Sequence, residues 1–481
     1  MSQQAAADLA YPLLSELLRE QAASIPTRTA MIFRGRETTY GVLDARASQV
    51  ANALIDAGVE QRSRIAYLGK NSDLYFELLF GAVRAGAVFV PLNWRLAPPE
   101  VAYVLQDSES VLVFVEKDFL PVVTQVRDKL PVLRDVIVMD GPTEGFTDFE
   151  SFRDQQSARD PHTPVGKNDP VLQMYTSGTT GNPKGVMLSN IGISALRVTE
   201  GQDGDWAVWG PHEMCLVSMP VFHVSGTCFA IWGFHAGATN VVLPQADADA
   251  IVDAIVNHRI TKLLIVPALI QMILERPDIG EIDLTSVKTL YYGASPISPD
   301  LLARSLAVFG CDFVQLYGMT ETSGTIVHLG PDQHDVKGTP RMASCGRAVA
   351  GVELRIVDEA GQILPPGEIG EIVIRTPTIM LGYWRKDDAT QEVLRDGWYY
   401  SGDAGYLDED GYLYICDRIK DMIVSGGENV YPAEVEKALQ SHPAVREVAV
   451  IGVPDQKWGE AVKAVVAFKP GMTATADELT A

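Results

Sequence analysis

The sequence predicts an α/β protein of more than one domain, in which parallel sheets covered by helices precede a smaller antiparallel β region. Strand-like and helix-like segments alternate from the N-terminus onwards. Near residue 346 the pattern changes to short alternating strands, and a third pattern begins after residue 420. A chain of 481 residues is also longer than one hydrophobic core usually serves, so two or three domains are expected.

The alternating part begins with an apolar strand at residues 30–33 and a segment at 41–57 in which apolar residues recur at helical spacing. Residues 73–85 form the next predicted helix. The further predicted strands of this part are residues 65–68, 87–91, 111–115, 136–139, 171–175, 215–219, 240–243 and 263–266. Strands that alternate with helices are typical of parallel sheets covered on both faces.

The rest of the chain predicts antiparallel structure and then a mixed segment. Short strands of alternating polarity are predicted at residues 352–358, 369–375 and 405–416. Gly- and Pro-rich turns such as residues 365–367 join them, which favours antiparallel pairing. Further on, a helix is predicted to begin at Pro432, a favourable residue for a first helical turn, and strands follow at 447–453 and 462–468.

The composition indicates a soluble globular protein that does not bind nucleic acid. Apolar residues make up 47% of the chain and charged residues 21%. The 62 acidic and 39 basic residues give a net charge of −23, which would repel a nucleic acid, and no local basic patch offsets this charge. Anionic substrates must therefore be held by a few placed cations and backbone donors.

Three features favour a cytoplasmic protein. The N-terminus has no basic start followed by an apolar run, so no export signal is predicted. Residues 214–246 lack charged side chains, but Pro220 and several glycines interrupt them, so a buried strand, loop and helix are expected rather than a membrane span. The five cysteines are scattered without zinc-binding spacing, as in a reducing compartment. No sequence feature indicates the oligomeric state.

The most informative segment is YTSGTTGNPKG at residues 175–185. A predicted strand runs into a loop built almost wholly of Gly, Ser and Thr, which Lys184 closes. Backbone N–H groups and hydroxyls of such a loop can surround anionic oxygens while the lysine supplies a positive charge. The loop is not a Walker A sequence, because Pro183 precedes the lysine and Gly185 follows it. Phosphate binding is predicted, with a flexible surface loop as the alternative.

This segment resembles the signature loop of the adenylate-forming superfamily, which includes acyl-CoA synthetases, firefly luciferase and the adenylation domains of peptide synthetases. Other motifs of that superfamily follow in the expected order, and the resemblance extends from about residue 12 to the end of the chain. These motifs are YGASPI at 292–297, YGMTE at 317–321, GWYYSGD at 397–403, DRIKDMIVSGGENVYPAEVE at 417–436 and VIGVPDQKWGEAVKAVV at 450–466.

The resemblance implies a large N-terminal domain at residues 1–419, made of two parallel-type α/β subdomains and a small antiparallel β-barrel at about 340–416. A small mobile α+β domain at 420–481 would follow, with Lys420 as the hinge or, alternatively, as a plain surface lysine. Relatives continue into a PKT-x-x-GK segment whose lysine reaches the reacting groups. The sequence stops at Ala481, so an incomplete C-terminal domain is expected, with natural loss of that lysine as the alternative.

The implied reaction activates a carboxylic acid with ATP and Mg²⁺ as an acyl-adenylate and then transfers the acyl group to CoA. The substrate's own carboxylate attacks the α-phosphate, so the protein supplies positioning and charge neutralisation. By resemblance the catalytic residues are Lys184, Thr320, Glu321 and Arg418, with Glu321 as the magnesium ligand. The residues expected to bind ATP or AMP are Thr176, Ser177, Gly178, Thr179, Thr180, Gly181, Lys184, Gly293, Ala294, Ser295, Tyr317, Gly318, Thr320, Asp403, Ile415 and Arg418.

Individual roles within this set also follow from the resemblance. Thr320 is expected to hydrogen-bond the α-phosphate, Tyr317 to stack on adenine, and Asp403 to accept both ribose hydroxyls. Arg418 would contact the ribose or phosphate side of the adenylate. Outside their motifs, Glu321 and Asp403 would be ordinary solvated or capping carboxylates, and Tyr317 would be a core residue.

The acid pocket implied by the resemblance comprises Phe222, His223 and Gly293. A histidine in an apolar stretch is usually a core residue, but in acyl- and aryl-CoA ligases this one lines the acid pocket. Residues 222–225 offer no carboxylate to pair with an ammonium group, so a free amino acid is a poor candidate. The implied CoA contacts are Gly426, Gly427 and Glu428.

The most specific prediction is a ligase that forms acyl-CoA from a medium- or long-chain fatty acid, ATP and CoA, releasing AMP and diphosphate. An aryl-CoA ligase for benzoate- or cinnamate-like acids is the nearest alternative. More distant alternatives are a luciferase-like oxygenase and a non-catalytic sensor of AMP or acyl-CoA. The intact Lys184, Glu321 and Asp403 argue against a sensor, and a peptide-synthetase domain would need an attached carrier domain.

Overall fold

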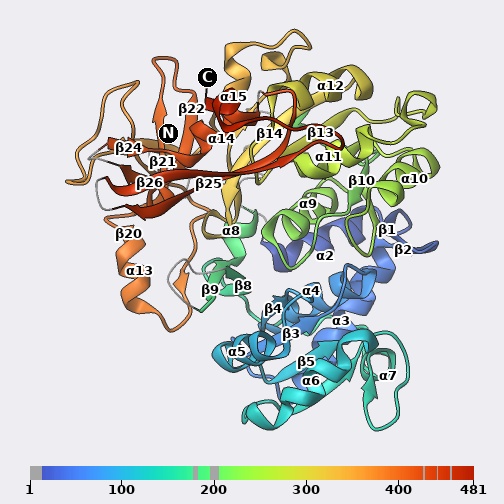
Figure 1. The fold of residues 1–481 in the computed structure, drawn as a ribbon. Coiled ribbons are helices and arrows are strands. Elements are labelled where there is room, and N and C mark those ends of the chain that lie inside the picture. Colours follow the sequence, from blue (N-terminus) through green and yellow to red (C-terminus); the bar gives the residue numbers. More distant parts are fainter. Residues whose placement is uncertain are drawn as a thin grey trace.

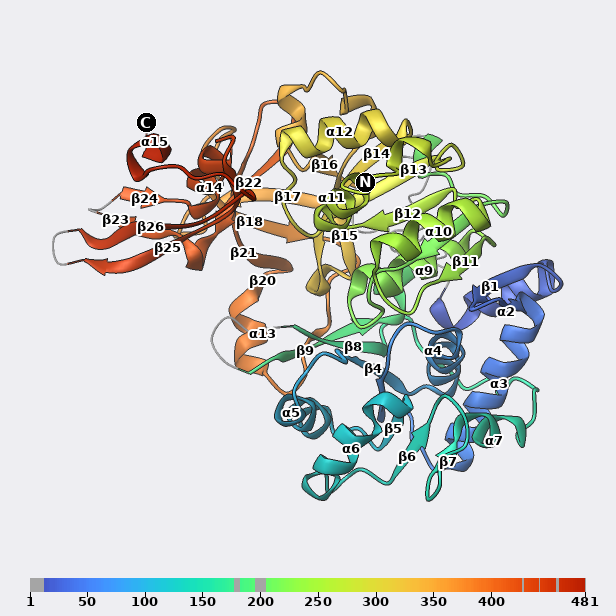
Figure 2. The ribbon, with the colours of Figure 1, turned by 45° about the vertical axis from the view of Figure 1, so that its right-hand side comes forward.

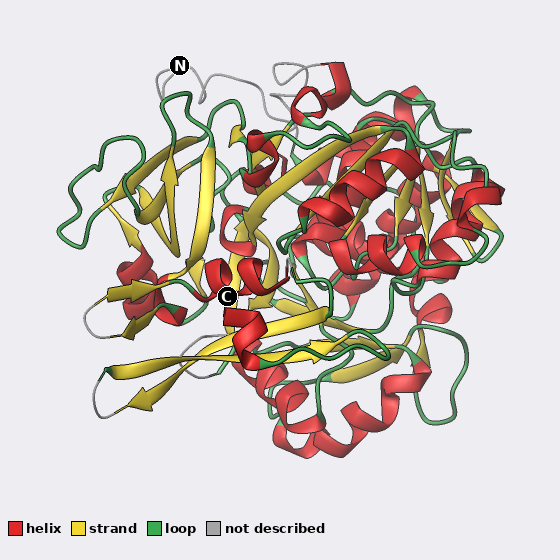
Figure 3. Cartoon of the chain, turned by 45° about the horizontal axis from the view of Figure 1, so that its top comes forward, coloured by secondary structure: helices red, strands yellow, loops and turns green. Residues whose placement is uncertain are grey.

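The computed structural model of the chain describes residues 13–176, 182–194, 205–425, 428–440, 442–455 and 458–480 (Figure 1). Within these residues the strands form four sheets, of which two are mainly parallel and two are antiparallel. Figure 3 shows the helices gathered around the parallel sheets, whereas the antiparallel part consists mostly of strands. The predicted α/β class with a later antiparallel part is confirmed.

The first parallel sheet has the strand order β19-β9-β8-β4-β3-β5-β6-β7. Its strands are β3 (Arg64–Leu68), β4 (Val88–Leu92), β5 (Leu112–Val115), β6 (Asp135–Val138), β7 (Thr147–Asp148), β8 (Pro170–Thr176), β9 (Lys184–Ser189) and β19 (Gly382–Tyr383). Its helices are α3 (Tyr40–Asp56), α4 (Asp73–Ala85), α5 (Pro98–Ser108), α6 (Leu120–Val126) and α7 (Phe149–Asp154). Helices α5 and α6 pack on one face, and α3, α4 and α7 pack on the other (Figure 2). The strands β9 and β19 pair antiparallel at one edge.

The second parallel sheet has the strand order β16-β15-β14-β13-β12-β10-β11-β1-β2. Its strands are β1 (Thr29–Phe33), β2 (Arg36–Thr39), β10 (Met214–Val217), β11 (Thr239–Val242), β12 (Lys262–Ile265), β13 (Thr289–Gly293), β14 (Asp312–Met319), β15 (Gly324–Leu329) and β16 (Arg347–Ala348). The helices are α2 (Leu14–Ser24), α9 (Val224–His235), α10 (Ala248–His258), α11 (Pro267–Leu274) and α12 (Pro299–Phe309), whereas α8 (Asn190–Ser194) lies against β8 and β9 of the first sheet. Helices α10, α11 and α12 share a core with one face, and α9 covers the other.

Helix α9 also joins the two parallel sheets. The ring of Phe234 at its end lies 5.3 Å from the rings of both Phe76 and Phe80 on α4, measured between centroids. The uncharged segment 214–246 therefore folds as strand β10, a loop, helix α9 and strand β11, as predicted. Among the described residues, no helix is long and apolar enough to cross a membrane.

The antiparallel sheets contain the remaining strands. The larger one, a half-barrel, consists of β17 (Glu353–Val357), β18 (Gly370–Arg375), β20 (Leu394–Arg395), β21 (Trp398–Leu407) and β22 (Leu413–Arg418), with α13 (Asp387–Val393). The smaller one consists of β23 (Ile423–Ser425), β24 (Glu428–Val430), β25 (Val445–Asp455) and β26 (Gly459–Phe468), with α14 (Pro432–Gln440) and α15 (Ala476–Thr480). A 3₁₀ turn, η9 (Ile419–Asp421), connects them at the predicted domain boundary, which stays a prediction.

Candidate active site at the ends of the strands

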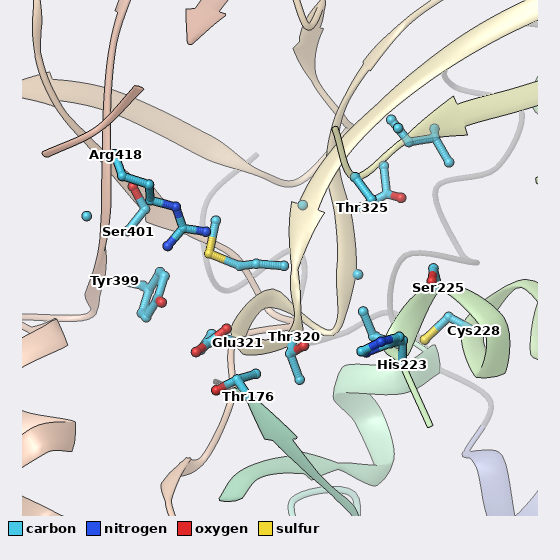
Figure 4. A pocket seen from close by; sticks show the side chains of 18 of the residues that line it. Thr176, His223, Ser225, Cys228, Thr320, Glu321, Thr325, Tyr399, Ser401 and Arg418 are labelled. Carbon is cyan, nitrogen blue, oxygen red and sulfur yellow. The ribbon is translucent and has the colours of Figure 1, made fainter. Parts of the chain in front are cut away.

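Ten of the predicted site residues line one cavity of about 1080 Å³, to which both parallel sheets and the half-barrel contribute side chains. Figure 4 shows Arg418, Ser401 and Tyr399 at one end and His223, Ser225 and Cys228 at the other, with Thr176, Thr320 and Glu321 between them. The cavity thus joins a polar end, rich in charged and hydroxyl groups, to an end lined mainly by apolar side chains.

Most of these residues follow the carboxyl ends of strands. Thr176 ends β8, Gly293 ends β13, and Thr320 follows β14. The loop after β10 leads to His223 at the start of α9. In α/β sheets, ligands bind in the crevice outside the carboxyl ends of the strands, because the connecting loops meet there. The fold therefore brings together motifs that lie far apart in the sequence.

The two residues that flank the predicted phosphate-binding loop pair with each other in the sheet. Thr176 at the end of β8 and Lys184 at the start of β9 face each other in the antiparallel ladder. Both line the polar end of the cavity. The predicted phosphate-binding residues Ser177, Gly178, Thr179, Thr180 and Gly181 lie outside the described residues, so their role stays a prediction.

Glu321 lies in the middle of the cavity, held by a short chain of hydroxyl groups. Its Oε1 accepts a hydrogen bond of 2.9 Å from the hydroxyl of Tyr383, which is itself hydrogen-bonded to Tyr399. The Lys184 ammonium lies 4.9 Å from the centre of the Tyr383 ring. Burial raises the pKa of Glu321, and the positive charges of Arg418 and Lys184 partly oppose that shift. The charges of these two cations therefore favour the ionised form of the carboxylate.

The donor set around Glu321 fits a magnesium ion that arrives with a nucleotide. A carboxylate and nearby threonine hydroxyls are hard oxygen donors, and Mg²⁺ is commonly held by one or two carboxylates together with substrate phosphates. Across the described residues there is no cluster of three or more His, Cys, Asp or Glu side chains that could hold a metal without substrate. Glu321 would therefore share the ion with the nucleotide.

Asp403 forms a second polar cluster beside Glu321. Arg418 faces it across the β21–β22 ladder, with its Nε 2.6 Å from Oδ1, and the hydroxyl of Tyr317 donates to Oδ2 at 2.6 Å. Burial raises the pKa of Asp403, whereas the charge of Arg418 and the Tyr317 hydrogen bond lower it. Both carboxylate oxygens are thus oriented by neighbours, and the guanidinium of Arg418 reaches into the cavity (Figure 4). The stacking of Tyr317 on adenine stays a prediction.

The predicted residues separate into three groups. Those that line the cavity are Thr176, Lys184, His223, Gly293, Ala294, Gly318, Thr320, Glu321, Arg418 and Lys420. A second group lies beside the cavity, and each of its members is adjacent in sequence to a lining residue or contacts one: Phe222, Ser295, Tyr317 and Asp403. Ile415 lies apart from them, half-buried in β22 opposite Gly405. Glu428 lies in β24 of the small sheet, paired with Ser425, and the predicted CoA contacts Gly426 and Gly427 lie outside the described residues.

The acid end is apolar around its histidine. His223 precedes the first residue of α9, and its ring lies 4.5 Å from that of Phe222, measured between centroids. Burial lowers the pKa of His223, and the charge of Arg95 lowers it further. Because the neutral imidazole is favoured, this end of the cavity is suited to the uncharged part of an acid.

Sequence analysis missed several lining residues, including Tyr383, Tyr399, Phe229 and Trp232. Tyr383 lies in the edge strand β19 and Tyr399 in β21, where an aromatic residue is ordinary, and the other two lie in a uniformly apolar helix. The close approach of Tyr383 to Glu321 also depends on a backbone hydrogen bond of 2.8 Å from Met380 N–H to the Glu321 carbonyl. No short-range pattern could have indicated these contacts.

Substitution of Tyr383 by Phe should slow adenylation by about one to two orders of magnitude, because the Glu321 carboxylate loses a charge-assisted hydrogen bond worth about 1.5–3 kcal/mol. The chain should still fold, since the ring that lies below Lys184 is kept. Titrating Mg²⁺ in nucleotide-binding measurements should show a weaker apparent metal affinity. The control is Tyr406→Phe, whose ring stacks on Tyr414 in the half-barrel. Equal metal titrations for both variants would refute the orienting role of Tyr383.

Comparison with known proteins identifies similar chains along the whole length. Residues 18–384 match the family model of the AMP-binding enzymes, and residues 434–481 match that of the AMP-binding enzyme C-terminal domain. The chain is 43% identical to the fatty acid–[acyl-carrier-protein] ligase ScoC of Streptomyces coeruleorubidus, over 96% of this chain and 88% of that protein. It is 40% identical to the indoleacetate–CoA ligase of Aromatoleum aromaticum, over 96% of this chain and 89% of that protein.

A solved structure has the same fold. The anthranilate CoA ligase AuaEII, crystallised in complex with anthranoyl-AMP, superposes with a TM-score of 0.89 at 28% identity. The alignment covers 99% of this chain and 90% of that one.

Proposed function

The chain belongs to the family of AMP-binding enzymes, and on that premise we propose that it is an acyl-CoA ligase, which converts a carboxylic acid, ATP and CoA into acyl-CoA, AMP and diphosphate. The observation that carries this proposal is one cavity that joins an end rich in charged and hydroxyl groups to an apolar end. Lys184, Glu321 and Arg418 stand where triphosphate and adenylate charge would lie, and the walls beyond His223 would hold the rest of the acid.

In the first half-reaction the substrate carboxylate attacks the α-phosphorus of ATP, and diphosphate leaves. Lys184 and Arg418 would neutralise the charge that spreads over the phosphate oxygens, and Thr320 would donate a hydrogen bond to the α-phosphate. Bound through Glu321, magnesium would supply Lewis-acid stabilisation of the phosphate charge. Asp403 would accept hydrogen bonds from the ribose hydroxyls and fix the nucleotide relative to the acid.

In the second half-reaction the CoA thiolate attacks the acyl carbonyl, and AMP leaves. We propose that the segment after η9 turns about Lys420 between the two steps, since this residue lies in the turn that connects the two antiparallel sheets and also lines the cavity. The strands β23 and β24 flank residues 426 and 427, which we propose contact the pantetheine arm. The charge of Arg418, close to the departing AMP, would stabilise it as a leaving group.

The lining of the acid end supports an apolar substrate. The side chains that follow His223 into the cavity are Val224, Ser225, Cys228, Phe229 and Trp232, and the facing wall adds Leu264, Val266 and Leu316. Burying a charged second carboxylate or an ammonium group there would be costly without a partner. A fatty acid of medium or long chain, as predicted from the sequence, and an aryl acid are the two classes that this lining supports.

Similarity to a ligase that charges an acyl carrier protein favours a second candidate for the acceptor. The 43% identical relative is named as a fatty acid–[acyl-carrier-protein] ligase. Carrier proteins present the same pantetheine thiol as CoA, so the first half-reaction would be unchanged, and only the surface that meets the acceptor would differ.

The test is acid-dependent release of diphosphate from ATP across a panel of fatty and aromatic acids, followed by supply of CoA or a holo-carrier protein. We expect release with apolar acids and formation of an acyl-CoA. Thioester on the carrier protein but not on CoA would favour the second candidate. Tight AMP binding without turnover of any acid would contradict both.

A further inference from the structure

Helix α9 presents one face to the acid end of the cavity. Ser225, Cys228, Phe229 and Trp232 are spaced three and four residues apart, so their side chains share that face, and all of them line the cavity. The small residues Ser225 and Cys228 lie near His223, where Figure 4 shows them, and the large rings follow one turn further along the helix. The lining of this face therefore changes from small side chains near His223 to large rings further along the helix.

The two rings are held by a second layer of aromatic residues. The centroid of Trp209 lies 5.2 Å from that of Phe229 and 5.7 Å from that of Trp232, and Tyr291 lies 5.9 and 6.2 Å from the same two rings. The Trp209 indole donates a hydrogen bond of 2.9 Å to the Tyr291 hydroxyl. Trp209, Phe229 and Tyr291 are each less than a tenth exposed, so these rings have little room to move.

Behind this second layer lies a buried charge. The ammonium of Lys262, a residue only 3% exposed, lies 5.3 Å from the Trp209 ring and 6.0 Å from the Tyr291 ring and donates a hydrogen bond to Thr289. An acyl chain that displaced the rings would reach this ammonium and remove its cation–π contacts. The aromatic layers therefore form a floor that a longer chain cannot easily pass.

Part of the wall opposite α9, beside Leu264, Val266 and Leu316, is backbone. Gly293, Gly318 and Gly324 line it. A methyl group placed on Gly324 would lie 3.8 Å from Val224 Cγ2 and 4.0 Å from Cys228 Sγ, so strand β15 and helix α9 approach closely there. Because these three positions carry no side chain, that part of the wall leaves room for a planar ring against α9.

Building on the proposed ligase function, we propose that the acid is an aryl acid of limited length and that Trp232, together with Phe229, sets this limit. A substrate ring packed between α9 and these glycines would meet Phe229 and Trp232 edge-to-face, an arrangement that aromatic pairs prefer. Its carboxylate would point back past His223 towards Thr320 and Glu321. Trp232 is thus a specificity-determining residue that contacts the end of the acid remote from the reacting carboxylate.

The experiment compares benzoate, cinnamate, octanoate and dodecanoate in the full chain by kcat/KM for acid-dependent diphosphate release. An aryl acid should exceed dodecanoate by about tenfold or more. Trp232→Ala should reverse this ranking, because each methylene that enters the opened space gains about fourfold. Trp232→Leu, which keeps an apolar side chain, should shift the ranking in the same direction. This variant tests the role of Trp232 if the alanine variant does not fold. The matched control is Trp206→Ala, in the same aromatic cluster but not among the described lining residues, which should leave the ranking unchanged.

Two outcomes separate this inference from the proposed function. If dodecanoate is the best substrate of the unaltered chain and neither Trp232 variant changes the ranking, the aromatic floor does not select the acid, although the ligase function stands. If no acid in the panel supports diphosphate release, the ligase function itself fails, and with it the assignment of an aryl substrate.

Discussion

Replacing Asp403 by Ala should weaken AMP binding by about two to four orders of magnitude. Two charge-assisted hydrogen bonds to the ribose would be lost, each worth about 1.5–3 kcal/mol. The same change removes the partner of Arg418 Nε and of the Tyr317 hydroxyl, so both side chains would lose the group that orients them. Isothermal titration calorimetry with AMP measures the loss directly, and ATP affinity should fall in parallel because the ribose is common to both.

A control for this variant lies on the same hairpin. Asp410 is an exposed carboxylate in the turn between β21 and β22, where it pairs with Arg341. Asp410→Ala should bind AMP as tightly as the unaltered chain. Unchanged AMP affinity in Asp403→Ala would disprove the ribose assignment, and equal losses in both variants would indicate damage to the hairpin rather than a lost contact.

Replacing Glu321 by Gln should reduce the rate of adenylation by about two to three orders of magnitude. The amide keeps the shape and one acceptor but lacks the charge that would hold magnesium, so the phosphate charge developing at the reacting centre is less well neutralised. Rapid-quench measurement of acyl-adenylate formation gives the rate of this step. Thioester formation from a supplied acyl-adenylate and CoA should be affected far less, because no triphosphate takes part. Equal slowing of both half-reactions would contradict a role confined to the metal-dependent step.

The pH dependence of the same step follows from the environment of Glu321. Burial raises the pKa of this carboxyl above its ordinary value, so the protonated form persists to a higher pH than for an exposed glutamate. The ionised form is the one that would bind magnesium. Magnesium-dependent ATP binding should therefore decline as the pH is lowered through this raised pKa, and Glu321→Gln should abolish that decline. Binding of AMP without metal should lack this component in both proteins.

The strands and the motif residues could be predicted because each depends on a short stretch of sequence. Predicted strands such as 65–68 and 171–175 agree with β3 and β8 to within one residue at each end, since apolar runs between helices have few other structures available. The motif residues Thr176, Thr320 and Glu321 meet because each stands at or just after the carboxyl end of a strand.

What the sequence could not indicate depends on contacts between distant elements. The segment 405–416, predicted as strand, contains the turn between β21 and β22, because Gly411 and the residues before it reverse the chain. The hydrogen bond from Tyr383 to Glu321 spans 62 positions. The aromatic floor of the acid end requires Trp232 of α9 to contact Trp209, which lies in the loop before β10. Uniformly apolar helices such as α9 give no sign of which face will line a cavity.

The central claim, that a substrate carboxylate attacks the α-phosphorus of ATP in this cavity, is tested most directly by isotope transfer. An apolar acid labelled with ¹⁸O in both carboxylate oxygens is converted with ATP and CoA, and the products are analysed by mass spectrometry. The account predicts that AMP carries one ¹⁸O atom, because the acyl–oxygen bond is broken when the thiol displaces AMP. Label found in phosphate or diphosphate, with none in AMP, would contradict it.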